Sequence, residues 1–260
     1  MNDQNDTIVF LGTAGARVMV TKQFLASGGT WLSLDSTEIL IDPGPGTLVR
    51  AIKKKLDPTR LDAIILSHKH LDHSVDINIM IEAMTESGRS RRGVVFAPSD
   101  ALNNEEGVIL PYLKDYPERI EILSQGKSYD IDGVVFETPV RHIHPVETYG
   151  LVFKTAKYTI SWITDTGYFD NLPDYYRGDL LIVNMVMMVH KDNVGHLSLA
   201  EVGEVIKRIK PGMAILTHFG MSVWRARPWE VAKQLSEEAH VPVIAARDGM
   251  KFDLAQLNMP

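Results

Sequence analysis

The stretch Ser67-His68-Lys69-His70-Leu71-Asp72-His73 follows an apolar run over residues 61–66, which predicts a buried strand ending in this loop. Imidazoles and a carboxylate this close together cannot remain unpaired in an apolar setting. Both are ligands for zinc, manganese or iron, and no thiolate is present to favour another metal. His68 and His70 point the same way in an extended segment, whereas Asp72 and His73 follow the turn. We therefore predict two adjacent metal ions rather than one.

Further candidate ligands stand where other apolar strands are predicted to end. Asp165 follows the run over residues 158–163, and His218 follows the run over residues 213–217. In layered α/β proteins, binding sites gather at strand ends, where loops meet. The segment after Val140 contains both His142 and His144, which compete as ligands, and the alternative for His142 is a place on a strand surface.

Alternating apolar residues and turn signals predict the remaining elements. Strands are expected over residues 7–11, 31–34, 38–41, 93–97, 120–123, 134–138, 151–153 and 179–183, with a closing hairpin of 241–246 and 250–254. Helices are expected after Thr47, which can cap one, over 75–84, after Ser198, which forms a capping box with Glu201, and from Pro228 with Trp229 on its apolar face. No linker or repeat interrupts this α/β pattern, so we predict one domain over residues 1–260.

Composition limits the class of protein. The 260 residues are 45% apolar with net charge −6, which suffices for one sizeable core. The absence of cysteine excludes disulfides and cysteine nucleophiles. The polar start is unlike a signal peptide and no apolar run approaches membrane-spanning length, so we expect a cytoplasmic protein without membrane contact. The acidic balance argues mildly against a large nucleic-acid surface, and we expect no DNA-binding module. Association into a homodimer is left open.

Two polar stretches and one aspartate each have two possible roles. Lys53-Lys54-Lys55 is expected to be a solvated face rather than a binding patch. Arg89-Ser90-Arg91-Arg92 is either a surface loop or a contact for an anionic substrate. Asp42, which ends a strand, either fixes a metal ligand from behind or serves a plain turn.

Taken together, His68-x-His70-x-Asp72-His73 with the later His144, Asp165 and His218 resembles the signature of the metallo-β-lactamase superfamily. Within it, the chain is most similar to the ribonuclease Z and cyclic-phosphodiesterase branch. The segments that carry this likeness are 10–13, 144–150, 195–198 and 216–219, and the run Pro145-Val146-Glu147-Thr148-Tyr149-Gly150 favours His144 over His142 as the ligand.

The resemblance implies an αββα four-layer sandwich, two mixed sheets with helices outside and two divalent metal ions at one edge. Carried over by residue, it implies that His68, His70 and His144 hold one metal, that Asp72, His73 and His218 hold the other, and that Asp165 bridges both. Zinc is the expected metal, with manganese or iron as alternatives. His196 matches the branch's extra histidine, the candidate proton donor to the leaving group.

The expected activity is hydrolysis of a phosphodiester, in a small molecule or RNA, by a metal-bridging hydroxide. Asp72 would both ligate a metal and orient the hydroxide, and His196 would be the acid. The chain departs from ribonuclease Z in having Asn184-Met185-Val186-Met187 where that family has a His-Glu pair, and in lacking a tRNA-clamping arm. The alternatives are hydrolysis of another ester, a thioester or a lactam on the same metals, and a catalytically silent metal-binding protein.

Overall fold

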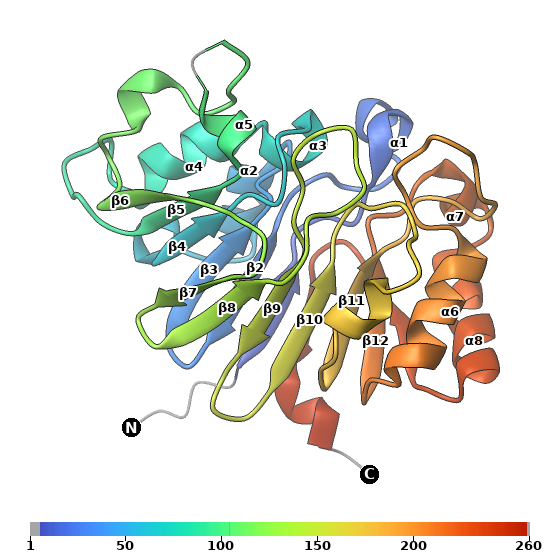
Figure 1. Ribbon diagram of the computed structural model, residues 1–260. Helices are drawn as coiled ribbons and strands as arrows, with labels where there is room; N and C mark the ends of the chain where they lie inside the picture. The colour runs from blue at the N-terminus through green and yellow to red at the C-terminus, as the bar shows by residue number, and fades with distance from the viewer. Residues whose placement is uncertain (1–5, 104, 259–260) are drawn as a thin grey trace.

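Two seven-stranded sheets form the centre of the computed structural model, which describes residues 6–103 and 105–258 (Figure 1). The first sheet has the order β14 (Met250–Asp253), β1 (Thr7–Phe10), β2 (Thr30–Leu34), β3 (Thr37–Ile41), β4 (Ala63–Ile65), β5 (Val94–Ala97), β6 (Arg119–Ile122). The second has the order β13 (Val243–Ala245), β12 (Met213–Thr217), β11 (Leu180–Asn184), β10 (Thr159–Ile163), β9 (Leu151–Lys154), β8 (Val134–Thr138), β7 (Lys127–Ile131).

The helices lie outside the sheets and in the loops at one edge (Figure 1). They are α1 (Ala16–Lys22), α2 (Thr47–Lys53), α3 (Leu71–Ser74), α4 (Ile77–Met84), α5 (Ser99–Leu102), α6 (Leu199–Ile209), α7 (Met221–Arg225) and α8 (Pro228–Ala239). Short 3-10 turns are η1 (Pro58–Arg60), η2 (Pro111–Leu113), η3 (Leu172–Tyr175) and η4 (Leu254–Asn258). In the described ranges the longest helix, α8, has 12 residues, and none of the helices is long and apolar enough to cross a membrane.

Three separate apolar clusters show that the elements stack in four layers. Alternate residues of a strand face opposite sides of its sheet, and β2 shows this: Leu32 and Leu34 pack between the two sheets, whereas Trp31 packs under α2 and α4. A third cluster joins β10–β12 to α6 and α8, through residues such as Val205 and Leu235. The αββα sandwich expected from the sequence is therefore confirmed.

Parallel strands bring the candidate ligands to one edge. β3, β4 and β5 run parallel in the first sheet, as do β10, β11 and β12 in the second. Their registers align Ile41 with Ile65 and Asn184 with Thr217, so the loops that follow these strands emerge side by side. This edge, at the top of Figure 1, carries α1, α3 and the loops after β8 and β11.

Several local predictions were wrong. Segments 241–246 and 250–254 do not form a hairpin, because β13 pairs with β12 in the second sheet and β14 pairs with β1 in the first. Thr47 is not an N-cap: Gly46 holds that position, and the Thr47 hydroxyl bonds to Gly44 O instead. Trp229 is 61% exposed rather than part of the apolar face of α8.

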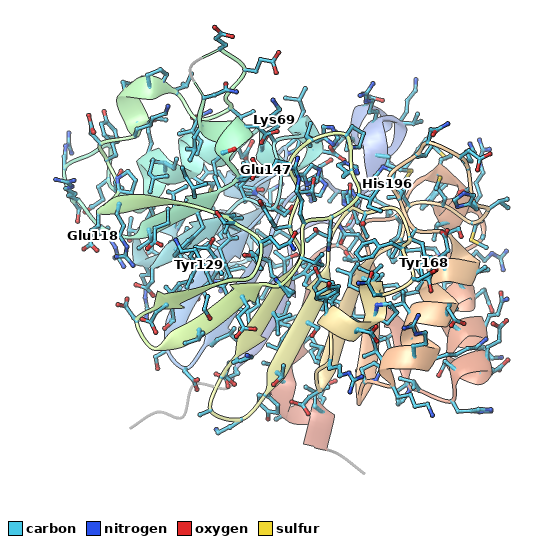
Figure 2. The ribbon with its side chains drawn as sticks, viewed as in Figure 1. Lys69, Glu118, Tyr129, Glu147, Tyr168 and His196 are labelled. Carbon is cyan, nitrogen blue, oxygen red and sulfur yellow. The ribbon has the colours of Figure 1, made fainter. Side chains whose placement is uncertain are left out.

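The arginine-rich stretch 89–92 lies away from the candidate site, so it is a surface loop rather than a contact for a substrate there. It precedes β5, and therefore lies at the end of the sheet opposite the candidate ligands. Arg91 donates to the carbonyls of Pro117 and Glu118, and Figure 2 shows Glu118 far from His196. Arg92 donates to Thr59 O and pairs with Asp62. These arginines brace neighbouring loops, and they do not reach the candidate site.

Candidate metal centre

The structure brings all seven predicted ligands together from five segments of the chain. His68 and His70 lie in the loop after β4, and Asp72 and His73 lie in α3. The other three follow β8, β10 and β12, and they are His144, Asp165 and His218. Every one of these positions follows the end of a strand at the shared edge.

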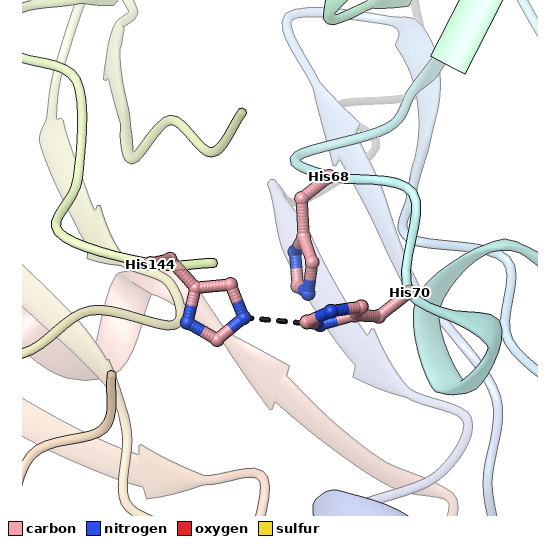
Figure 3. A group of neighbouring side chains, drawn as sticks. All are labelled: His68, His70 and His144. Carbon is pink, nitrogen blue, oxygen red and sulfur yellow. Dashed lines mark hydrogen bonds between the residues drawn. The ribbon is translucent and has the colours of Figure 1, made fainter. Parts of the chain in front are cut away.

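The first cluster contains His68, His70 and His144 (Figure 3). Their ligand nitrogens all lie within 4.8 Å of one another, and His144 Nε2 is 3.0 Å from His70 Nδ1. The Nδ1–H of His144 donates to the carbonyl of Gly195 at 2.8 Å, so Nε2 presents a lone pair towards His70. A cation held between the two rings would be bound by this lone pair.

The second cluster contains Asp72, His73 and His218. His73 Nε2 and His218 Nε2 are 3.2 Å apart, and Asp72 Oδ2 is 3.9 Å and 3.6 Å from them. Zinc–nitrogen bonds of about 2.0–2.1 Å place the ligands of a tetrahedral ion about 3.3 Å apart. The second cluster therefore has the spacing of ligands around one small divalent ion.

Asp165 stands between the clusters and is 3% exposed. Its Oδ2 is 3.9 Å from His68 Nε2 and 3.5 Å from the Nε2 atoms of both His73 and His218. Its other oxygen, Oδ1, accepts a hydrogen bond from Asn184. One carboxylate oxygen thus faces both sets of imidazoles.

An unpartnered nitrogen provides a direct test of whether a metal fits. His68 is fully buried, and its Nδ1 faces Ser67 Oγ at 3.0 Å. Its Nε2 has no hydrogen-bond partner. Leaving a buried polar atom unpaired costs on the order of 1–3 kcal/mol, and a cation beside Asp165 would remove that cost. The His/Asp clusters fit a binuclear metal site.

Asp42 contacts the candidate ligand His73 from behind, which agrees with the first of its two predicted roles. Its Oδ2 faces His73 Nδ1 at 2.9 Å and accepts the Ser67 hydroxyl at 2.7 Å. Ser67 in turn contacts His68, so one carboxylate orients a histidine of each cluster. Such contacts set which ring nitrogen faces a metal. Asp42 is also near His68 in space, but its oxygens are already used by these donors.

The electrostatics of the site also favour cations. Burial lowers the pKa of His68 well below its usual value, and burial lowers the pKa of His144 to about 4, so both remain neutral ligands. Burial disfavours the Asp165 carboxylate, but His218 and His196 outweigh it and hold the pKa of Asp165 well below its usual range. Burial disfavours the charged form of His73, but Asp42 and Asp72 raise its pKa well above normal.

His142 is not on a strand surface, so the sequence interpretation was wrong. The residue is 4% exposed, and its Nε2 faces the Tyr176 hydroxyl at 2.6 Å. Its Nδ1 faces the backbone carbonyl of Asp165 at 3.2 Å. Both ring nitrogens of His142 therefore have partners outside the clusters, and one of them contacts the backbone of Asp165. His144, and not His142, lies with His68 and His70 in the first cluster.

His196 lies in the loop before α6 (Figure 2). Its Nδ1 is 3.5 Å from Asp165 Oδ2 and has no hydrogen-bond partner, and its ring centroid is 5.2 Å from that of His144. Burial is the main cause that lowers the pKa of His196. The side chain is 17% exposed, so it can reach both the site and an entering ligand.

Sequence reasoning missed several supporting residues. Asn184 was assigned only to a strand end, and Ser67 was not given a role, yet both bond to residues of the site. The close approach of Gly15 to the site was also missed: a Cβ there would lie 2.2 Å from the His218 carbonyl oxygen. His218 and Asp42 have φ of 57° and 49°, a left-handed backbone uncommon outside glycine. The one sequence signal for these supporting roles is that the residues stand at or after the ends of predicted strands.

Comparison with known proteins identifies the family. The Beta-lactamase superfamily domain matches residues 37–219. An uncharacterized protein of Methanocaldococcus jannaschii is 30% identical over 95% of this chain and 94% of its own length. A ribonuclease Z of Clostridium botulinum is 34% identical, but over 47% of this chain and 38% of that protein. The crystal structure of the metallo-β-lactamase fold protein YhfI from Bacillus subtilis superposes with a TM-score of 0.81 at 20% identity, covering 96% and 100% of the two chains. The chain therefore belongs to the metallo-β-lactamase superfamily of hydrolases, and carries that family's fold with a His/Asp metal-site cluster at one edge.

Proposed function

We propose that this protein is a binuclear metal-dependent phosphodiesterase, acting on a small phosphodiester or on RNA. The observation that carries the proposal is the position of Asp165 Oδ2. This one oxygen lies 3.9 Å from His68 Nε2 in the first cluster and 3.5 Å from His73 Nε2 in the second. Two ligand sets that share one carboxylate suit the paired-metal arrangement used for displacement at phosphorus.

The ligand assignment follows the two clusters. His68, His70 and His144 would hold one ion, Asp72, His73 and His218 the other, and Asp165 both. Nitrogen and oxygen ligands without sulfur suit zinc, with manganese or iron as alternatives. When bound, such a pair supplies a water-derived nucleophile at neutral pH and stabilises charge on the phosphoryl oxygens.

The chain's own groups would orient the reaction. Asp72 Oδ2 accepts a hydrogen bond from Ala16 N–H at 3.2 Å, which fixes the carboxylate beside His218 and lets it direct an attacking water. His196 stands at the rim with a partly exposed ring, where it can hand a proton to the departing oxygen. A leaving alkoxide needs that proton, because it is strongly basic when it departs.

A phosphodiester is favoured over other esters by sequence similarity. The aligned ribonuclease Z is named for an activity on RNA, and the alignment covers 47% of this chain. The segments predicted to resemble that branch include 195–198, which contains His196. The aligned part is 38% of the ribonuclease, so the substrates to be assayed include smaller diesters as well as RNA.

The test begins with metal content, measured by mass spectrometry on protein purified with zinc or manganese. Turnover of bis(p-nitrophenyl) phosphate is then measured, followed by cyclic nucleotides, linear diesters, a pre-tRNA, a thioester and a lactam. We expect two equivalents of metal and turnover of a diester. His70→Ala should lose the metal of the first cluster and abolish turnover, whereas His240→Ala, at an exposed position on the α8 terminus, should change neither metal content nor turnover. Two metals with turnover only of a thioester or lactam, or with no turnover at all, would refute the phosphodiesterase assignment.

A further inference from the structure

Two buried side chains that the proposed reaction does not use form a chain of hydrogen bonds ending on Asp165. The indole Nε1–H of Trp162 donates to Asn184 Oδ1 at 3.2 Å. The amide nitrogen of Asn184 donates to Asp165 Oδ1 at 2.9 Å. Trp162 is 4% and Asn184 5% exposed, and they come from the adjacent parallel strands β10 and β11.

The order of this chain is fixed by chemistry. An indole nitrogen can only donate, so it must meet the oxygen of the Asn184 amide and not its NH₂ group. The NH₂ group is therefore turned towards Asp165. The carboxylate in turn uses Oδ1 for this bond, which leaves Oδ2 to face His68, His73 and His218.

The backbone of Asp165 is held independently of its side chain. His142 Nδ1 faces the Asp165 carbonyl at 3.2 Å, and Thr166 Oγ1 accepts the amide of Ile143. With the backbone fixed, the remaining freedom of Asp165 is rotation of its carboxylate. Asn184 removes that freedom, since a rotated carboxylate would leave the buried amide without its acceptor.

We propose that Asn184, oriented by Trp162, is a positioning residue that makes Asp165 offer a single oxygen to both metal ions. This inference rests on the proposed binuclear site. Partners that orient ligands from behind typically change metal affinity by about 10–100-fold when removed. The metal pair should therefore depend on a neutral amide and an indole that never touch a metal.

The two residues should contribute unequally. A polar pocket at the second cluster adjoins both Trp162 and Asn184 and is also lined by Asp72, His73 and His218. The pocket has room for water. In Trp162→Phe a water in this pocket can supply the lost donor to Asn184 Oδ1, whereas Asn184→Leu removes the amide that donates to Asp165 Oδ1.

The experiment measures zinc affinity by competition with a chromophoric chelator, and the visible spectrum of the cobalt-substituted protein. We expect Asn184→Leu to bind zinc about 10–100-fold more weakly and to change the cobalt spectrum. Trp162→Phe should show a smaller shift of the same kind. Because the residues act in series, the double variant should bind zinc no more weakly than Asn184→Leu alone.

Trp31→Phe is a matched control. Trp31 is 1% exposed and its indole also donates to a side chain, Glu38, but it packs on the outer face of the first sheet. It should lower stability without changing zinc affinity or the cobalt spectrum. This control also separates positioning from packing if Asn184→Leu fails to fold, because Trp162→Phe is then compared with Trp31→Phe.

The outcomes distinguish the two proposals. If the unmodified protein binds fewer than two metals, the binuclear site itself is refuted. If it binds two, and Asn184→Leu and Trp162→Phe bind them with unchanged affinity and spectrum, the positioning role is refuted. Additive losses in the double variant would contradict action in series, as would equal effects of Trp162→Phe and Trp31→Phe.

Discussion

At the scale of single residues, several candidate ligands are oriented by a hydrogen bond at the ring nitrogen or carboxylate oxygen that faces away from the clusters. His144 uses Nδ1 to donate to Gly195, and His73 uses Nδ1 against Asp42, so each ring presents Nε2 to its cluster. Asp165 follows the same rule with oxygens, since Oδ1 is taken by Asn184. These three candidate ligands are thus each held by one bond away from the centre, which lowers the entropy lost when a metal binds.

Asp165→Ala is predicted to lose metal and activity together. The substitution removes the carboxylate oxygen that faces both clusters and leaves several buried imidazoles without a counter-charge. Metal analysis and diester turnover, measured on the same preparation, check this. Asp170→Ala, an exposed residue of the same loop, serves as the control and should change neither. Retained stoichiometry and rate would contradict the bridging role.

His196→Gln is predicted to keep both metals and slow turnover by about 10²–10⁴-fold, the usual contribution of a general acid. His196 lies beside the clusters, with its Nδ1 3.5 Å from Asp165 Oδ2, and it is not one of the seven candidate ligands. A substrate with a good leaving group, such as p-nitrophenolate, should suffer less than an alkyl diester. His190→Gln, exposed on the same loop, is the control. An unchanged rate on the alkyl diester would remove His196 from the mechanism.

At the scale of elements, the loop after β1 holds the loop after β12. Ala14 forms a β-bridge with Phe219, and Gly15 N–H donates to Phe219 O at 2.9 Å. Asp248 accepts hydrogen bonds from Thr13 and Ala26, so it ties the same loop to the turn before β14. The loop after β1 therefore lies against the backbone of His218 at Gly15.

Gly15→Ala is therefore predicted to weaken the second cluster. The added methyl would meet the His218 carbonyl oxygen at 2.2 Å, so one loop must move. Overpacking of this kind costs about 1–3 kcal/mol. Denaturant unfolding should show the loss, and one metal equivalent should bind more weakly. Gly167→Ala, whose nearest atoms would lie 3.7 Å away, should leave both measurements unchanged. Equal behaviour of the two variants would show that close approach at Gly15 is unimportant.

At the scale of the whole molecule, burying histidines couples folding to pH. Burial lowers the pKa of His142 to about 4, from an unfolded value of 6.5. Between these values the unfolded chain binds the proton and the folded chain does not, so unfolding is favoured as pH falls. The stabilisation is fully present above pH 6.5 and disappears as pH falls from about 6.5 to 4. Over this pH range, the contribution of His142 to the free energy of unfolding falls by about 3 kcal/mol.

We expect the free energy of unfolding to fall by about 2 kcal/mol between pH 7.5 and pH 5 on account of His142 alone. Urea unfolding of the metal-free protein at the two pH values, compared with His142→Asn, measures this contribution. The variant cannot take up the proton, so its stability should depend less on pH even if it is lower at pH 7.5. An identical pH dependence in the two proteins would show that His142 is not buried neutral.

The sequence by itself determined the identity of the candidate ligands and most of the elements that carry them. His68, His70, Asp72 and His73 could be recognised because they are adjacent in the chain and follow a buried strand, and Asp165 and His218 because they end similar strands. Strand and helix periodicities are local, so they can be read in short windows. The αββα layering followed from the resemblance that these residues carry.

Only the tertiary structure decided how distant segments meet. It separated β13 and β14 into different sheets, buried His142 against Tyr176, and turned Asn184 towards Asp165. It also set which nitrogen of each histidine faces its partners, as in the approach of His73 to His218 across 145 positions of sequence. These features depend on contacts between strands far apart in the chain, and no local pattern of hydrophobicity or turn residues encodes such contacts.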